Sequence, residues 1–330
     1  MKILITGITG FVGSHLAEYI LNLKENHSIY GICRWRSPKD NLKNIYSKVK
    51  LLEADLCDLS SLVRSMTELA PDIIFHLGAQ SYVLASFNSP VQTLMTNAIG
   101  TANLLEAIRI SGINPIIHIC SSSEVYGQVS QEDIPIKENC PFRPASPYAV
   151  SKATEDMLAF QYWISYGLRT IRTRMFTHTG PRRGDVFALS FFAKQVAAAE
   201  LGLAEPVIYA GNLKSVRTFC DVRDAVRAYW IMVNKCKAGE VYNIGGNRTM
   251  TIGEALDSLL SYTKLKFEIK IDPKLLRPSD VTLQIPCIDK FRNDTEWEPE
   301  IPFERTLQDI LIYWREELSR SPWKLVTVAK

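Results

Sequence analysis

The sequence lacks the features that mark several other classes of protein. Its seven cysteines are irregularly spaced and form no Cys-x-x-Cys pair, which favours reduced thiols over a disulfide framework. No apolar run is long enough to span a bilayer, and strand-like residues directly follow Met1, so neither a membrane anchor nor a signal peptide is expected. These absences predict a cytoplasmic protein.

The sequence also has no large excess of basic or acidic residues. The chain has 38 basic and 35 acidic residues, a net charge of +3, and no run of like charge that would form a nucleic-acid-binding stripe. No His, Cys or Asp spacing suggests a metal site. What is present is a hydrophobic content of 46%, enough for a large core. An anionic ligand would therefore have to be bound by local groups.

The first 120 residues repeat one pattern, a short apolar run followed by a turn and an amphipathic helix. This pattern predicts a doubly wound α/β fold with a Rossmann-type parallel sheet. The expected strands, each predicted to be buried on both faces, are Ile3–Thr6, Ser28–Cys33, Val49–Glu53, Ile73–Leu77 and Ile116–Cys120. The expected helices are Ser14–Leu23, Leu59–Leu69 with Asp58 as N-cap, and Val91–Ser111.

The second half has a looser, proline-punctuated pattern, which predicts a smaller mixed α/β lobe. We expect residues 1–175 to form a dinucleotide-binding domain and residues 176–330 a substrate-binding lobe. Glu240–Ile244 resembles a late buried strand, so the chain is predicted to return to the main sheet near residues 240–246.

A glycine-rich turn lies between the first strand and the first helix. Gly7, Gly10 and Gly13, in GITGFVG, are placed where backbone amides at a helix N-terminus can bind a pyrophosphate. A tight turn without a ligand is the alternative. The position of the motif at the start of the chain, directly after a buried strand, favours a dinucleotide site.

The residues after the second strand bear on the choice of cofactor. A protein that prefers NAD would place an acid there, but Arg34 and Arg36 follow Cys33 instead. Two guanidiniums suit a 2′-phosphate, so NADP is predicted over NAD, with solvated arginines as the alternative. Asp55, after the third strand, is placed to accept from the adenine amino group or to cap a helix.

A possible catalytic group lies in SPYAVSK, where Tyr148 and Lys152 are one helical turn apart. A nearby ammonium favours the phenolate, which can take a proton from a sugar hydroxyl while a nicotinamide takes the hydride. Ser122, in CSSSEVYG, follows the fifth strand and adds a hydroxyl. The three residues together are far more specific than Tyr-x-x-x-Lys alone.

Taken together, GITGFVG, HLGAQS, SSSEVYG and YAVSK resemble the extended short-chain dehydrogenase/reductase family over essentially the whole chain. Within it, the sequence is similar to GDP-mannose 4,6-dehydratases and to GDP-4-keto-6-deoxymannose reductases. The resemblance implies an NAD(P)-binding Rossmann domain, a nucleotide-sugar lobe, and homodimers or homotetramers. It also implies a basic loop after Cys33 that reaches a neighbouring subunit's cofactor.

Segments of the chain resemble different branches. HLGAQSYV (76–83) and PRRGDVF (181–187) resemble the dehydratases, whereas RTFCDVRDAVRAYW (217–230) and LLRPSDV (275–281) resemble the reductases. Thr177 stands where dehydratases have Asn, and Ser122 where they have a catalytic threonine. Resemblance assigns Glu124 as the base that removes the C5 proton. A reductase can retain Glu at this position, so Glu124 permits dehydration without proving it.

The sequence thus predicts a three-part site. The catalytic residues are Ser122, Glu124, Tyr148 and Lys152. The cofactor residues, which again include Tyr148 and Lys152, are Gly7, Thr9, Gly10, Phe11, Val12, Gly13, Arg34, Arg36, Asp55, Leu56, Leu77, Gly78 and Ala79. The substrate residues, several of them arginines suited to a diphosphate, are Ser81, Thr177, Arg182, Arg183, Asn212, Arg217, Arg277 and Asp280.

The predicted function is an NADP-dependent nucleotide-sugar 4,6-dehydratase that acts on GDP-mannose or a related GDP-sugar such as a GDP-heptose. An NADPH-dependent 4-keto reductase is the first alternative. A nucleotide-sugar epimerase and a cofactor-binding protein without turnover are further ones, and the intact Tyr148, Lys152, Ser122 and Glu124 argue against the last.

Overall fold

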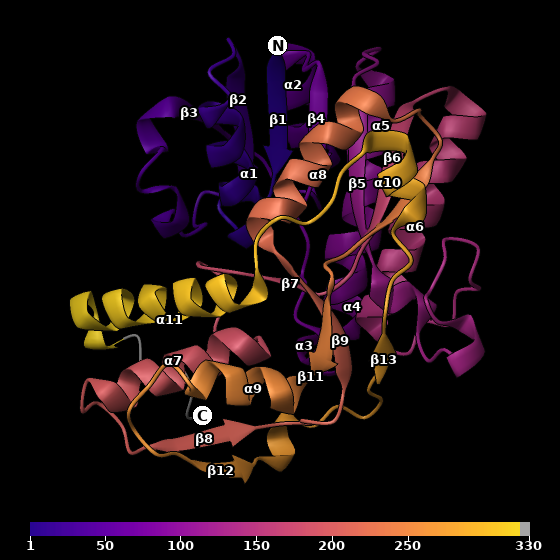
Figure 1. The fold of residues 1–330 in the computed structure, drawn as a ribbon. Coiled ribbons are helices and arrows are strands. Elements are labelled where there is room, and N and C mark those ends of the chain that lie inside the picture. The colour runs from indigo at the N-terminus through magenta and orange to yellow at the C-terminus, as the bar shows by residue number, and fades with distance from the viewer. Residues whose placement is uncertain (324–330) are drawn as a thin grey trace.

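The computed structural model describes residues 1–323 and is built around a parallel sheet of seven strands (Figure 1). The strand order is β10-β6-β5-β4-β1-β2-β3, and every neighbouring pair is parallel. The strands are β1 (Lys2–Thr6), β2 (Ser28–Cys33), β3 (Val49–Glu53), β4 (Ile73–His76), β5 (Ile116–Ser122), β6 (Arg169–Met175) and β10 (Val241–Ile244).

Helices cover both faces of this sheet and bury separate apolar clusters against it. One face carries α1 (Phe11–Asn22), α8 (Val222–Lys235) and α10 (Asp289–Thr295). The other carries α2 (Leu59–Leu69), α5 (Gly100–Ile110) and α6 (Pro147–Tyr166). This is the predicted doubly wound architecture, in which ligands bind beyond the carboxyl ends of the strands.

The smaller lobe lies beyond those carboxyl ends, in the lower part of Figure 1. It has its own apolar core between α7 (Ala188–Glu200), α9 (Ile252–Leu260) and α11 (Phe303–Arg320). Two small sheets complete it. One contains β7 (His178–Thr179), β9 (Val216–Asp221), β11 (Arg248–Thr251) and β13 (Leu283–Gln284), and the other β8 (Val207–Ala210) and β12 (Glu268–Ile271).

Four of the predicted strands lie in the interior of the sheet, but β3 does not. It is the edge strand, and Lys50 and Glu53 are exposed, so the expectation that it is buried on both faces was wrong. Charged, exposed side chains such as these are typical of an edge strand. The late strand is confirmed, since β10 pairs with β6.

Two helices differ from the prediction for backbone reasons. The first begins at Phe11 rather than Ser14, because Gly10 is its N-cap. The predicted helix 91–111 is interrupted, with α4 (Pro90–Leu94) followed by a π-helical turn (Met95–Ile99) and then α5. A π-turn inserts an extra residue and often marks a functional site. Asp58 caps α2 as expected, accepting from the Ser60 amide.

The division after residue 175 stays a prediction, because α8, β10 and α10 of the second half pack on the large sheet. All seven cysteines lie within residues 1–323 and are free. None of the helices in this part of the chain combines the length and apolar character needed to cross a membrane.

Candidate active site

Two depressions meet at the carboxyl edge of the large sheet. The larger, here called the cofactor cleft, has a volume of about 730 Å³ and runs from the glycine turn to Lys152. The smaller, the substrate pocket, has a volume of about 260 Å³ and extends from Glu124 to Asp280 in the second lobe. Ser81, Ser122, Tyr148 and Arg183 line both, so a group bound in one contacts a group bound in the other at Tyr148.

The glycine turn packs closely against its own backbone and against the turn after β4. Gly7 has a φ of +70°, and a Cβ there would lie 2.8 Å from Gly78 Cα, while a Cβ on Gly13 would lie 2.3 Å from Gly7 O. Gly10, the N-cap of α1, offers no side-chain cap to the first amides of the helix, and the first turn of the helix lines the cleft. This cradle fits the pyrophosphate of a dinucleotide.

The cleft opens where the strand order reverses, between β1 and β4. Thr6 Oγ1 accepts from the amides of Leu77 at 3.1 Å and Gly78 at 3.0 Å, which fixes the turn after β4. The predicted cofactor residues that line this cleft are Gly7, Thr9, Gly10, Phe11, Val12, Gly13, Arg34, Asp55, Leu56, Leu77, Gly78, Ala79, Tyr148 and Lys152.

Arg36 is the exception among the predicted cofactor residues. Arg34 lines the cofactor cleft, but the Arg36 guanidinium stacks on the exposed Trp35 ring, 4.2 Å from its centroid, and does not line the cleft. Of the two predicted arginines, the structure brings one to the site. Asp55 lines the cleft while its Oδ1 accepts from the Cys57 amide at 2.9 Å, and the helix cap is Asp58 instead.

Helix α6 holds Tyr148 and Lys152 in the first turns after its cap. Ser146 caps the helix by accepting from the Ala149 amide, and Pro147 occupies the first helical position. Burial raises the pKa of Tyr148, whereas the charge of Lys152 and a hydrogen bond with Ser122 act to lower it. The predicted juxtaposition of phenol, ammonium and hydroxyl is therefore present.

Ser122 ends β5 and accepts from the Glu124 amide at 3.2 Å, which starts a 3₁₀ turn at Ser123–Tyr126. The turn presents Glu124 to the substrate pocket, where its carboxylate lies 3.6 Å from the Arg277 guanidinium. The side chain of Glu124 is 14% exposed. A carboxylate thus lines the same pocket as the Tyr148 phenol.

The second lobe contributes a charged cluster around Asp280. Its Oδ2 accepts from Asn212 at 2.8 Å and Ser215 at 2.7 Å, and its Oδ1 lies 3.6 Å from Arg217 and 3.7 Å from Arg277. The carboxylate pairs with two arginines that line the pocket, Arg217 and Arg277. Thr177 and Ser81 also line the pocket.

The neighbouring arginines of PRRGDVF have different positions. Arg183 lines both depressions, and its guanidinium lies 3.9 Å from the centroid of the Phe187 ring and 5.1 Å from that of Phe11. Burial lowers the pKa of Arg183 to about 10, so the residue is a desolvated cation at neutral pH.

Arg182 was predicted to bind substrate, but the structure turns it away from both depressions. Its backbone φ is +71°, and its guanidinium pairs with Glu18 at 2.6 Å and contacts His15 on α1. Arg182 therefore ties the loop to the first helix. The sequence could not separate the two arginines, because only the backbone decides which way each points.

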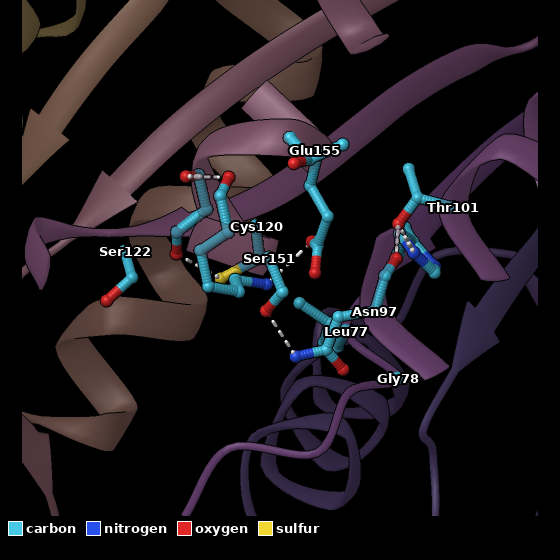
Figure 2. A network of polar contacts seen from close by, with 12 residues as sticks. Leu77, Gly78, Asn97, Thr101, Cys120, Ser122, Ser151 and Glu155 are labelled. Carbon is cyan, nitrogen blue, oxygen red and sulfur yellow. Dashed lines mark hydrogen bonds and ion pairs between the residues drawn. The ribbon is translucent and has the colours of Figure 1, made fainter. Parts of the chain in front are cut away.

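A group of buried polar residues behind the cofactor cleft was not predicted from the sequence. Asn97, in the π-helical turn, donates to Ser151 Oγ of α6 at 2.9 Å (Figure 2). Glu155, also on α6, accepts from Lys152 Nζ at 2.6 Å. Both residues are at most 1% exposed. Their only sequence signal was a polar residue at a core-facing helical position.

Fold and site together define a short-chain dehydrogenase/reductase, with a Rossmann sheet, a glycine turn and a Tyr148–Lys152 pair. The model of one family, described as GDP-mannose 4,6 dehydratase, matches residues 4–310, and the chain belongs to that family. This confirms the family resemblance of the motifs.

The relatives of this chain include both a reductase and dehydratases. The chain is 32% identical to a GDP-6-deoxy-D-mannose reductase of Pseudomonas aeruginosa, over 96% of this chain and 98% of the relative. It is 33% identical to a GDP-mannose 4,6-dehydratase of Yersinia enterocolitica, over 94% of this chain and 92% of the relative. The NADPH complex of RMD from Pseudomonas aeruginosa superposes with a TM-score of 0.83 at 31% identity, covering 96% of this chain and 99% of that one.

Proposed function

We propose that this chain is a nucleotide-sugar 4,6-dehydratase that acts on GDP-mannose or a related GDP-sugar such as a GDP-heptose. The observation that carries the proposal is Glu124, a carboxylate in the substrate pocket alongside Tyr148 and Ser122. Dehydration requires two proton acceptors on one sugar, one for the C4 hydroxyl and one for C5. Tyr148 and Glu124 line the same pocket and supply both.

The residues of the chain divide the proton transfers between them. The Tyr148 phenolate takes the proton of the C4 hydroxyl, with Ser122 as hydrogen-bond donor to the same oxygen. When bound, the nicotinamide supplies the acceptor and later the donor of the hydride. The Glu124 carboxylate takes the C5 proton, which the C4 ketone has made acidic, and passes it to the C6 hydroxyl, which leaves as water. When the hydride returns to C6, C5 regains one proton, which balances the proton that Tyr148 took from the C4 hydroxyl.

Recognition of the diphosphate falls to the arginines of the pocket. Arg183, Arg217 and Arg277 line it, and Asp280 holds two of them in place. Burial lowers the pKa of Arg217, yet the charges of Glu124 and Asp280 favour the charged form. Forked guanidiniums bind phosphate oxygens by charge-assisted hydrogen bonds. Asn212, Thr177 and Ser81 add uncharged polar groups for the nucleoside and sugar.

NADP is the proposed cofactor. Arg34 lines the cofactor cleft after β2, at the end where a 2′-phosphate would lie, and no acid takes that place. The similar reductase structure from Pseudomonas aeruginosa contains NADPH, which supports the same choice.

A homodimer is proposed on the basis of an apolar face formed by α4, the π-helical turn and α6. Its members repeat at helical spacing and are exposed, from 42% at Val150 and Phe160 to 71% at Val91; they are Val91, Met95, Ile99, Val150, Met157, Phe160 and Ile164. A contiguous apolar surface of this kind is typical of a subunit interface. Assembly to a tetramer and a cytoplasmic location remain predictions.

A reductase that acts on the 4-keto-6-deoxy product is the second candidate. Tyr148, Lys152 and Ser122 would suffice for that reaction, and the relatives at 32% and 33% identity include one enzyme of each kind. The two differ in stoichiometry, because a dehydratase conserves its cofactor whereas a reductase consumes NADPH.

The deciding experiment is incubation of the purified protein with GDP-mannose and catalytic NADP, followed by mass spectrometry of the sugar. Loss of one water without net change in NADPH is the expected result. Glu124→Gln should abolish it, while Glu132→Gln, at an exposed position of the same loop region, should not. NADPH oxidation on the 4-keto-6-deoxy sugar, with no water loss from GDP-mannose, would instead assign the reductase function.

A further inference from the structure

A buried carboxylate behind the cofactor cleft takes no part in the proposed mechanism. Glu155 lies on α6, one turn after Lys152, and is 1% exposed. Its Oε2 accepts from Lys152 Nζ at 2.6 Å. Its Oε1 is also buried and has no hydrogen-bond partner among the described residues. Such burial of a carboxylate is costly unless a charge partner or a function compensates it.

The other titratable groups around this pair do not compete for Lys152. On α6 the neighbouring Asp156 is bound to Arg172 and Arg174 of β6, at 3.0 and 2.9 Å. On β4 and β5, burial lowers the pKa of His76 and of His118 to about 3, which leaves both neutral.

Cys120 on β5 is likewise uncharged, because burial raises the pKa of its thiol. On the cleft side stands Tyr148, one turn before Lys152. Within residues 1–323, Glu155 is therefore the anion paired with the Lys152 ammonium.

Electrostatics links this pair to Tyr148. Burial acts to lower the pKa of Lys152 and so disfavours the ammonium, but the charge of Glu155 raises the pKa above its usual value. The charge of Lys152 in turn acts to lower the pKa of Tyr148. Burial raises the pKa of Glu155 to about 7, against the opposing effect of Lys152. Loss of the carboxylate would thus change the charge beside Tyr148 without touching Tyr148 itself.

We propose that Glu155 is a positioning residue, which holds Lys152 as a charged ammonium at the back of the cofactor cleft and thereby sets the pH at which Tyr148 accepts a proton. The geometry that carries this inference is the 2.6 Å contact between two side chains that are 6% and 1% exposed. The inference rests on the proposed role of Tyr148, but its test does not require the sugar.

The test is Glu155→Gln, which preserves shape and removes the charge. With NADP bound and no sugar present, the ultraviolet absorbance of the Tyr148 phenolate is titrated as the difference between each protein and its Tyr148→Phe counterpart. We expect the midpoint to rise by about one pH unit or more, which corresponds to a tenfold lower acid dissociation constant of the Tyr148 phenol. With substrate, the acid limb of the pH profile of kcat should move in the same direction.

Asp156→Asn is the matched control, since it removes the adjacent buried carboxylate of the same helix. It should lower the melting temperature and leave the phenolate midpoint where it was. An unchanged midpoint in Glu155→Gln would overturn the proposal. So would a lower midpoint, because Lys152 would then stay charged by itself and Glu155 would act on Tyr148 only by repulsion.

Glu155→Asp covers the case in which the Gln variant does not fold. It moves the carboxylate one methylene away from Nζ, and the midpoint should shift in the same direction by a smaller amount. A midpoint equal to that of the parent would contradict the proposal. Because the titration uses cofactor alone, its outcome is independent of whether GDP-mannose is dehydrated.

Discussion

The cofactor cleft and the substrate pocket meet at Tyr148 but are built in different ways. The cleft is formed largely by backbone at strand ends, such as the glycine turn, whose members are close in the chain. The pocket combines apolar residues with charged side chains from distant segments, such as Glu124 and Arg277, which lie 3.6 Å apart in space. Backbone geometry is insensitive to most substitutions, whereas the pocket depends on individual ion pairs.

The largest effect is expected from a substitution of Tyr148, where the cofactor cleft and the substrate pocket meet. Tyr148→Phe removes the proton acceptor and leaves the ring packed, so kcat should fall by about 10³-fold. The affinity for NADP, measured by fluorescence quenching, should change by less than about threefold, because the backbone cradle is intact. A parallel loss of cofactor binding would show that cleft and pocket are not separable at this position.

Acid is expected to destabilise the part of the molecule that contains the large sheet and the cofactor cleft. Burial lowers the pKa values of His15, His76, His118 and His178 to about 3, so the unfolded chain binds more protons below pH 6.5 and stability falls from there toward pH 3. The raised pKa of Glu155, about 7, offsets one of the four between pH 7 and 4.5. The net difference of three protons corresponds to about 4 kcal/mol of unfolding free energy per pH unit.

Urea unfolding at pH 6 and pH 5 would measure that slope. His118→Asn, which replaces one of the four histidines by a non-titrating amide, should reduce the slope by about a third. A slope that is unchanged in this variant would mean that acid acts elsewhere, for example on the ion pairs of the pocket.

The two arginines of PRRGDVF provide a matched pair for the pocket. Arg183→Ala removes a desolvated cation that lines both depressions, so KM for GDP-mannose should rise roughly 10- to 100-fold. Arg182→Ala removes a contact to Glu18 and should cost about 1 kcal/mol of stability, with KM within about twofold. Steady-state kinetics and thermal melts of both variants would measure these effects on KM and on stability. Equal effects on KM would reject the assignment of different roles.

The smallest expected effect concerns cofactor choice. Arg34→Ala should raise KM for NADP roughly tenfold and leave that for NAD nearly unchanged, because only the 2′-phosphate contact is lost. Arg36→Ala, whose guanidinium stacks on Trp35 instead, is the control and should change neither value by more than about twofold. A larger effect of Arg36 would indicate that this loop rearranges around the cofactor or in the assembled oligomer.

Local pattern was enough to predict the alternation of strands and helices, the glycine turn and the Tyr148–Lys152 spacing. Each depends on residues within one or two helical turns of each other, so periodicity and turn chemistry suffice. The same reasoning failed where local pattern has little information. The strand β3, expected to be buried on both faces, is an edge strand with exposed charges, and the helix expected over 91–111 is interrupted by the π-helical turn at Met95–Ile99.

The sequence by itself therefore determined the fold class, the glycine turn and the candidate catalytic residue types. Only the tertiary structure decided which of two adjacent arginines enters the pocket, that Asp280 holds Arg217 and Arg277, and that Glu155 is paired with Lys152. The physical reason is that such ion pairs form between side chains whose directions depend on backbone angles and on packing of the whole chain. Composition and spacing along one segment do not contain that information.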